Sequence, residues 1–202
     1  MADAPVLTGL LLAGGGSRRM GHDKTAREFL FEGEPLAARV ARLLREACDE
    51  VIVASGDGER LAWVGLPQVA DALPGSGPLR GLVAGLEAAR HQLVAVAAAD
   101  MPFASPAILR LLASLIGPHD AAVPVSPRGV EPLHAVYSRT ALPSFEAALR
   151  EGRFAVRVAL EGLDVRVVEE SEWRPADPSG RFVENLNRPG DARTFVEPPP
   201  RN

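Results

Sequence analysis

The sequence predicts a three-layer α/β fold with a mainly parallel sheet, and three observations support this class. Short apolar runs that end at glycine or aspartate alternate with segments whose apolar residues recur at helical spacing. Several of these runs are almost continuously apolar, as strands buried on both faces of a parallel sheet are. No repeat or linker divides the 202 residues. We therefore expect one domain over residues 1–202, with a loose tail over about 197–202.

The predicted strands begin with "VLTGLLLA" at Val6–Ala13, which runs directly into three glycines. The remaining strand candidates, in chain order, are Glu50–Ser55, Leu66–Asp71, Gln92–Asp100, Asp120–Ser126, Pro132–Ser138 and Val165–Val168. Helices are predicted over Pro35–Glu46, Gly81–Arg90, Ser105–Ile116 and Leu142–Arg150. Pro35 suits a first helical turn, and Ser105 suits an N-cap. Alternation of this kind places helices on both faces of a sheet.

Composition excludes several classes of protein. A net charge of −4 argues against a general nucleic-acid surface, which needs a strong basic excess. The apolar run after Asp3 spans about seven residues, too short for a signal peptide or a membrane segment. The single cysteine, Cys48, cannot form an internal disulfide, and the four histidines lack metal-ligand spacing with it. We therefore expect a cytoplasmic protein with no membrane or nucleic-acid partner, in which Cys48 packs in the core.

The most informative stretch is "LLAGGGSRRMGHDKT", Leu11–Thr25. It is not a Walker A loop, because His22 and Asp23 separate its second glycine from the lysine. It is not a dinucleotide fingerprint either, because Arg19 stands where the third glycine is required. Its glycines still allow backbone N–H groups to approach phosphate oxygens. Lys24, the only lysine in the chain, supplies a compact ammonium for such oxygens, so we interpret the stretch as a phosphate-binding loop.

Two aspartates stand at the ends of predicted strands. Asp71 ends the third predicted strand and Asp100 ends the fourth. Ligands of open parallel sheets bind at the carboxyl ends of strands, near the switch in strand order, so both carboxylates would meet the glycine-rich loop there. Because a carboxylate repels a polyphosphate unless a divalent cation lies between them, Asp100 suggests a magnesium site. Either aspartate alone could instead cap a turn, but their convergence with the loop favours binding.

Five motifs, in order along the chain, resemble those of the molybdenum cofactor guanylyltransferases, the MobA family. "LAGGGSRRMGHDK" resembles the family's first motif, L-A-G-G-x-S-x-R-M-G-x-D-K. The later motifs are resembled by "GPLRGL" (Gly77–Leu82), "DMPF" (Asp100–Phe103), "EPLHAVYS" (Glu131–Ser138) and "FVENLNRPGD" (Phe182–Asp191). The wider nucleotidyltransferase group shares the first motif, and the ordered set is more specific to the MobA family.

The resemblance implies a Rossmann-like nucleotidyltransferase fold and a Mg²⁺-dependent reaction. That reaction joins GMP from GTP to the phosphate of molybdopterin, releasing pyrophosphate and forming molybdopterin guanine dinucleotide. By the same resemblance, Arg19, Lys24 and Asp100 are catalytic, Asp100 holds the metal, and Asn185 and Asn187 face the pterin. The implied nucleotide contacts are Leu12, Ala13, Gly14, Gly15, Lys24, Asp71, Gly77, Pro78, Gly81 and Asp100. A molybdopterin-delivering protein or a recipient molybdoenzyme is an implied partner.

Three alternatives remain open at this point. Cytidylyltransferases for the same cofactor resemble L-A-A-G at the first motif and end in D-x-D-T-P, so Gly15 and the "NLN" of Asn185–Asn187 favour guanine. A sugar-1-phosphate nucleotidylyltransferase shares a glycine-rich loop with arginine and lysine, but usually carries a longer C-terminal part. A non-catalytic nucleotide-binding adaptor would not need Asp100 for a metal.

Some positions depart from the family's pattern. Ala54 and Ser55 stand at the end of the second predicted strand, where the family often has an asparagine that contacts the nucleotide. Arg188 and Gly190 replace a threonine and a glutamate, and Gly152–Leu160 lacks the more polar pattern of the family. Most of these departures concern the pterin side, so the nucleotide site is the better supported part of the prediction.

Overall fold

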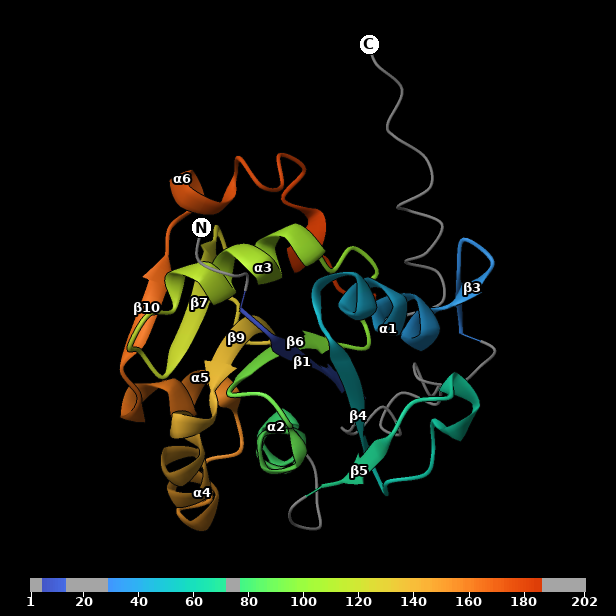
Figure 1. Ribbon diagram of the computed structural model, residues 1–202, viewed down its shortest axis with the longest axis horizontal. Coiled ribbons are helices and arrows are strands. Elements are labelled where there is room, and N and C mark those ends of the chain that lie inside the picture. The colour runs from blue at the N-terminus through green and yellow to red at the C-terminus, as the bar shows by residue number, and fades with distance from the viewer. Residues whose placement is uncertain (1–4, 14–28, 72–76, 187–202) are drawn as a thin grey trace.

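A central sheet separates two layers of helices in the computed structural model (Figure 1). The structure describes residues 5–13, 29–71 and 77–186. In spatial order the main path of the sheet is β10 (Val165–Val168), β7 (Ala121–Ser126), β9 (His134–Ser138), β6 (Leu93–Ala98), β1 (Leu7–Leu12), β4 (Glu50–Gly56) and β5 (Gln68–Ala70). The predicted three-layer α/β architecture is confirmed.

Strand β1 lies at the centre of the sheet, with β6 on one side and β4 on the other, and all three run parallel. Every residue of β1 is buried, because helices cover both faces of the sheet here, which explains its apolar sequence "LTGLLL". Strand β5 is parallel to β4, and β10 is parallel to β7. Strand β9 is antiparallel to both β6 and β7. The sheet is therefore mainly parallel, as predicted, with β9 as the exception on its main path.

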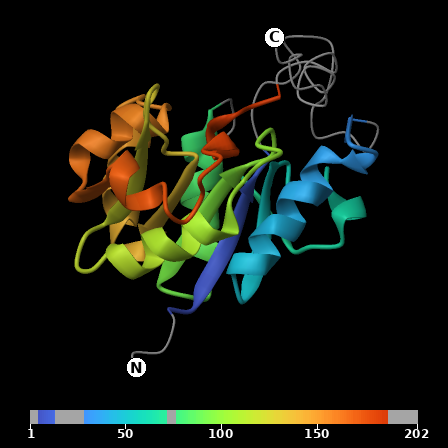
Figure 2. The ribbon, with the colours of Figure 1, turned by 90° about the horizontal axis from the view of Figure 1, so that it is seen from above.

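The helices divide into two layers. One face is covered by α1 (Leu36–Ala47) and α3 (Pro106–Leu115), which lie side by side in Figure 2, and the other by α2 (Pro78–Ala88), α4 (Leu142–Arg150) and the short α5 (Val156–Ala159). Ser105 caps α3 as predicted, because its Oγ accepts a hydrogen bond from the N–H of Ile108 at 3.5 Å. Within the described residues, no helix has the length and apolar character needed to cross a membrane.

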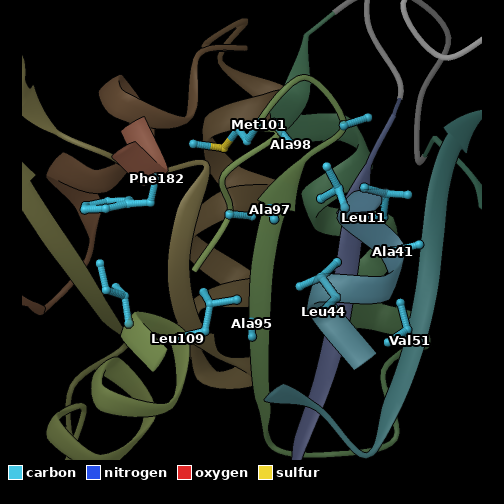
Figure 3. Packing of buried hydrophobic residues seen from close by; sticks show 14 of the residues in the cluster. Leu11, Ala41, Leu44, Val51, Ala95, Ala97, Ala98, Met101, Leu109 and Phe182 are labelled. Carbon is cyan, nitrogen blue, oxygen red and sulfur yellow. The ribbon is translucent and has the colours of Figure 1, made fainter. Parts of the chain in front are cut away.

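The core beneath α1 and α3 consists of apolar side chains from these helices and from the strands below them. Figure 3 shows Leu44 of α1 and Leu11 of β1 in this layer, and both are fully buried. Burying a leucine in this way contributes about 1.5–3 kcal/mol. Cys48 caps the C-terminal end of α1 and packs against the same core, where burial raises its pKa to about 12. The reactive thiolate form is therefore disfavoured at neutral pH, which fits the predicted packing against the core.

Several predicted boundaries were wrong by one to three residues, including the following three. Helix α2 begins at Pro78 rather than at Gly81, because Gly77 precedes it with φ of +126° and the proline takes the first helical position. Pro35 does not lie in the first turn of α1 but ends the short strand β3 directly before it. The strand predicted over Leu66–Asp71 is shorter, because β5 covers only Gln68–Ala70, all three of which pair with β4.

Five short strands and α-helices of the described residues were not predicted from the sequence, and neither were the 3-10 helices. The five are β2 (Leu30–Phe31), β3 (Glu34–Pro35), β8 (Gly129–Val130), α5 (Val156–Ala159) and α6 (Glu170–Trp173). Strands β2 and β3 form a separate hairpin, and β8 pairs with β7. Each of the five is too short to show the periodicity from which longer elements are predicted.

Candidate active site

Four parallel strands, β6, β1, β4 and β5, end at the same edge of the sheet. The chain passes from β1 outward to β4 and β5 and then returns to β6, so strand order switches between β1 and β6. Asp71 directly follows β5, Asp100 closely follows β6, and Ala13 leads from β1 into the glycine-rich sequence. The structure therefore brings both aspartates and the start of that loop to one edge, at the switch point.

Backbone hydrogen bonds extend this edge beyond the strands. The N–H of Ala13 donates to the carbonyl of Ala54 at 2.9 Å, and the N–H of Ala99 donates to the carbonyl of Leu12 at 2.9 Å. Leu12 and Ala13 are each only 5% exposed, so they offer a ligand little side-chain surface. Five predicted site residues lie outside the described residues, namely Gly14, Gly15, Arg19, Lys24 and Asn187.

Asp71 presents a buried carboxylate oxygen, Oδ1, that has no hydrogen-bond partner among the described residues. Burial raises the pKa of this carboxyl, and the positive charges of Arg80 and Arg60 oppose the rise. The backbone N–H of Asp71 donates to the carbonyl of Gly56 at 3.0 Å, which fixes the residue at the end of β5. Because an unsatisfied buried acceptor costs free energy, a ligand that donates an N–H or O–H to Oδ1 would be stabilised here.

Arg60 brings a positive charge to the same edge and was not predicted from the sequence. Its Nη2 donates a hydrogen bond to the carbonyl oxygen of Ala13. Its backbone N–H donates to Oδ1 of Asp57 at 2.8 Å, which anchors the turn that carries it. The hydrogen bond from Arg60 to Ala13 joins residues 47 positions apart in the sequence, and it depends on the strand order that places β1 beside β4. No local signal in the sequence distinguishes Arg60 from the many other arginines.

Gly77 and Gly81, predicted to line the nucleotide pocket, set the position of α2. A Cβ at Gly81 would lie 3.1 Å from Cβ of Ala54 and 3.4 Å from Oδ1 of Asp71, so only a glycine allows this close approach without movement. Gly77 has φ of +126°, and a Cβ there would lie 3.1 Å from the backbone oxygen of Phe154. The two glycines therefore hold the start of α2 close to Asp71.

Replacing Gly81 with valine is expected to lower the free energy of unfolding by about 1–3 kcal/mol, because the added methyl groups overlap Ala54 and Leu12. The same overlap displaces Asp71, so binding of GTP, the nucleotide that the sequence resemblance implies, should weaken as well. Urea unfolding and GTP titration measure the two effects. Ala88→Val, at an exposed position of the same helix, controls for the lower helix propensity of valine. Equal losses in the two variants would contradict this account.

The segment that carries Asn185 is attached to the loop after β6. The N–H of Leu186 donates to the backbone carbonyl of Asp100 at 2.8 Å. Leu186 is fully buried, whereas Asn185 is exposed, and Asp100 is half-buried. Asn185, predicted to face the pterin, is therefore the neighbour of a residue that hydrogen-bonds to Asp100, the predicted metal ligand. Asn185 and Asp100 are far apart in the sequence.

The two residues of β4 that depart from the family's pattern differ in their surroundings. Ala54 is fully buried, with Gly81 of α2 packed closely against it. Ser55 is 1% exposed, and its Oγ has no hydrogen-bond partner among the described residues. Neither residue therefore offers the side-chain amide of the asparagine that the family often has at this place. Polar groups close to the ends of β4 and β5 come instead from Asp71 and Arg60.

Comparison with known proteins identifies the family. Residues 9–168, which run from β1 to the end of β10, match the family model of the MobA-like NTP transferase domain. This chain belongs to that family. A relative of this MobA-like NTP transferase from Chloroflexus aggregans is 38% identical over 194 residues, with 93% of this chain and 92% of the relative covered. A protein of Desulfosudis oleivorans named molybdenum cofactor guanylyltransferase is 36% identical over 183 residues, with 90% of each chain covered.

Two crystal structures share the fold of this MobA-like NTP transferase. Molybdopterin-guanine dinucleotide biosynthesis protein A from Archaeoglobus fulgidus is 27% identical, with a TM-score of 0.79 over 93% of this chain and 95% of that one. The 2-C-methyl-D-erythritol 4-phosphate cytidylyltransferase of Thermus thermophilus has a TM-score of 0.66 at 20% identity, a likeness of fold alone. The predicted Rossmann-like nucleotidyltransferase fold is confirmed.

Proposed function

We propose that this chain transfers GMP from GTP to the phosphate of molybdopterin and so forms molybdopterin guanine dinucleotide. The observation that carries the proposal is the meeting of Asp71, Asp100 and the start of the glycine-rich loop at the switch point of the sheet. Ligands of such sheets bind at this position. The name of the Desulfosudis oleivorans relative, which matches this chain over most of its length, supports the choice of substrates.

In the proposed reaction an oxygen of the molybdopterin phosphate attacks the α-phosphorus of GTP. The bond from the α-phosphorus to the bridging oxygen breaks, and pyrophosphate leaves. The attacking phosphate is already ionised at neutral pH, so the step requires no general base. The main obstacle is the repulsion between two anions, which positioning and positive charge overcome. We assign Lys24 and Arg19 to the triphosphate for this reason.

We assign Mg²⁺ to Asp100 and the phosphate oxygens of the bound nucleotide. The described residues contain no cluster of three or more side chains able to hold a metal. One carboxylate combined with substrate phosphates is an arrangement that Mg²⁺ commonly adopts, and Asp100 suits it at the end of β6. The bound metal would neutralise negative charge on the phosphates and help to orient them.

We assign the nucleoside to the side of the site formed by β1, β5 and the start of α2. The Oδ1 atom of Asp71 would accept a hydrogen bond from a donor group of the nucleoside. Leu12 and Ala13 would contribute backbone groups, and Gly77, Pro78 and Gly81 would enclose the nucleotide. On the other side of β1, Asn185 and Asn187 would face the pterin.

We also propose that the reaction takes place in the cytoplasm and that a molybdopterin-delivering protein or a recipient molybdoenzyme is a partner. A chain with one cysteine, which is partly buried against the core, fits a reducing compartment.

Pyrophosphate release with Mg²⁺ and molybdenum-loaded molybdopterin, with GTP or CTP, tests the proposal. We expect turnover with GTP and a loss of about 10²-fold or more in Lys24→Ala, because a cation that stabilises transferring phosphates is removed. Arg45→Ala, at an exposed position on α1, controls for the loss of one positive charge.

Each other outcome would contradict part of the proposal. Turnover with CTP in place of GTP would keep the mechanism and refute the assignment to guanine. Pyrophosphate release from neither nucleotide would contradict the proposed reaction, and sugar 1-phosphates would then be tested as acceptors. Nucleotide binding without turnover of any acceptor would favour the adaptor.

A further inference from the structure

His134, the first residue of β9, is completely buried and contacts the segment that follows Asp100. Its Nε2 accepts a hydrogen bond from the backbone N–H of Ser105 at 2.9 Å. Ser105 is the N-cap of α3 and ends the loop that begins at Asp100. Because Nε2 accepts, the proton of the neutral ring lies on Nδ1, which has no hydrogen-bond partner among the described residues.

The same imidazole contacts the segment that carries Asn185. The ring centroids of His134 and Phe182 are 4.8 Å apart, and those of Phe182 and Trp173 are 5.0 Å apart. Phe182 lies in a short turn that leads directly to Asn185 and Leu186. His134 therefore contacts both the loop that follows Asp100 and the turn that precedes Leu186. The hydrogen bond from Leu186 to the backbone of Asp100 joins the same two segments.

An apolar residue could not replace the imidazole without cost. Ser105 is 8% exposed, so its backbone N–H would lose its acceptor in a largely buried place. Leaving such a donor without an acceptor is unfavourable, so we expect the loop to shift in that variant. The loop that moves is the one that begins at Asp100. A histidine at this position thus fixes that loop through a hydrogen bond as well as through packing.

We propose that His134 is a positioning residue that holds the loop of Asp100 and the segment of Asn185 in a fixed relation to each other. The inference rests on the proposed function, in which the first carries the metal and the second faces the pterin. In-line transfer requires the attacking phosphate and the α-phosphorus to be aligned, and a displacement of about 1 Å can cost about 10²-fold in rate. His134 acts on this alignment through its hydrogen bond to Ser105 and its ring contact with Phe182.

The chain offers matched variants for a test. His134→Leu removes the acceptor, and His134→Gln keeps an acceptor oxygen. Tyr137→Phe is the control, because Tyr137 is fully buried on the same strand and its hydroxyl donates to Pro132 at 2.7 Å. This control loses a buried hydrogen bond but touches neither the Ser105 loop nor Phe182.

Steady-state kinetics is the first measurement. For folded His134→Leu we expect kcat to fall by about 10²-fold while KM for GTP stays within about twofold of wild type. His134→Gln should recover most of the loss, and Tyr137→Phe should keep the kcat of wild type. A kcat of His134→Leu equal to that of Tyr137→Phe would overturn the proposal.

Hydrogen exchange at backbone amides is the second measurement and does not depend on activity. In His134→Leu, exchange should accelerate at both Ser105 and Leu186, relative to amides of β1, while Tyr137→Phe leaves both unchanged. Acceleration at Ser105 alone would refute the link between the two segments. Should His134→Leu not fold, Phe182→Leu breaks the ring contact from the other side and must accelerate exchange at Ser105. If wild type releases no pyrophosphate, the proposed function fails, and exchange still decides the role of His134.

Discussion

Asp100→Asn is expected to lower the rate of pyrophosphate release by about 10³-fold, a loss of about 4 kcal/mol in transition-state stabilisation. Asparagine has almost the same shape as aspartate, but it lacks the negative charge that holds Mg²⁺ against the phosphates. The hydrogen bond from Leu186 goes to the backbone carbonyl of Asp100, so the substitution leaves it in place. The variant should therefore fold normally and still bind GTP.

Initial rates over a range of Mg²⁺ concentrations measure this effect. We expect the half-saturating Mg²⁺ concentration to rise in Asp100→Asn. The matched control is Asp49→Asn, at a position that precedes β4 at the opposite end of the parallel strands. Oδ2 of Asp49 accepts a hydrogen bond from the N–H of Leu7 at 2.9 Å, and the amide oxygen of asparagine can accept the same bond. Asp49→Asn should keep full activity. A wild-type rate in Asp100→Asn would contradict the metal assignment and favour a nucleotide-binding adaptor.

The fold could be predicted where its elements are long and buried. Leu7–Leu12 and Leu93–Ala98 are apolar on both faces because helices cover both faces of the sheet, and this pattern is visible in the sequence. The direction of His134–Ser138 could not be predicted, because a strand has the same alternation whether it runs parallel or antiparallel to its neighbours. Strand direction follows from the connections between elements, which local periodicity does not describe.

The candidate site divides in the same way. Asp71 and Asp100 could be predicted because each stands at the end of a strand, a position readable from the sequence. Arg60 and His134 could not, because their contacts join residues 47 and 29 positions apart. Those contacts exist only once the strand order places β1 beside β4 and β9 beside β6. Candidate ligand contacts at strand ends can thus be predicted from local position, whereas candidate positioning residues require the folded topology.

His134 is expected to make the free energy of unfolding fall in acid. Burial lowers its pKa from 6.5 to about 4, and the negative charge of Asp177 offsets only part of this effect. In the unfolded chain the imidazole binds a proton below about pH 6.5, whereas in the folded chain it resists protonation down to about pH 4. Stability from this residue is therefore fully present above pH 6.5 and is lost progressively as the pH falls from 6.5 to 4. At 1.36 kcal/mol per pKa unit, the loss approaches about 3 kcal/mol.

Urea unfolding of wild type and His134→Gln at pH 7.5 and pH 4.5 isolates this contribution, because the carboxyl groups titrate in both proteins. We expect wild type to lose about 2–3 kcal/mol more than the variant between the two pH values. Protonated Nε2 can no longer accept from Ser105, so the same titration should release the loop that begins at Asp100. Equal losses in the two proteins would mean that His134 is not held neutral, and its hydrogen bond to Ser105 would then have to form in some other way.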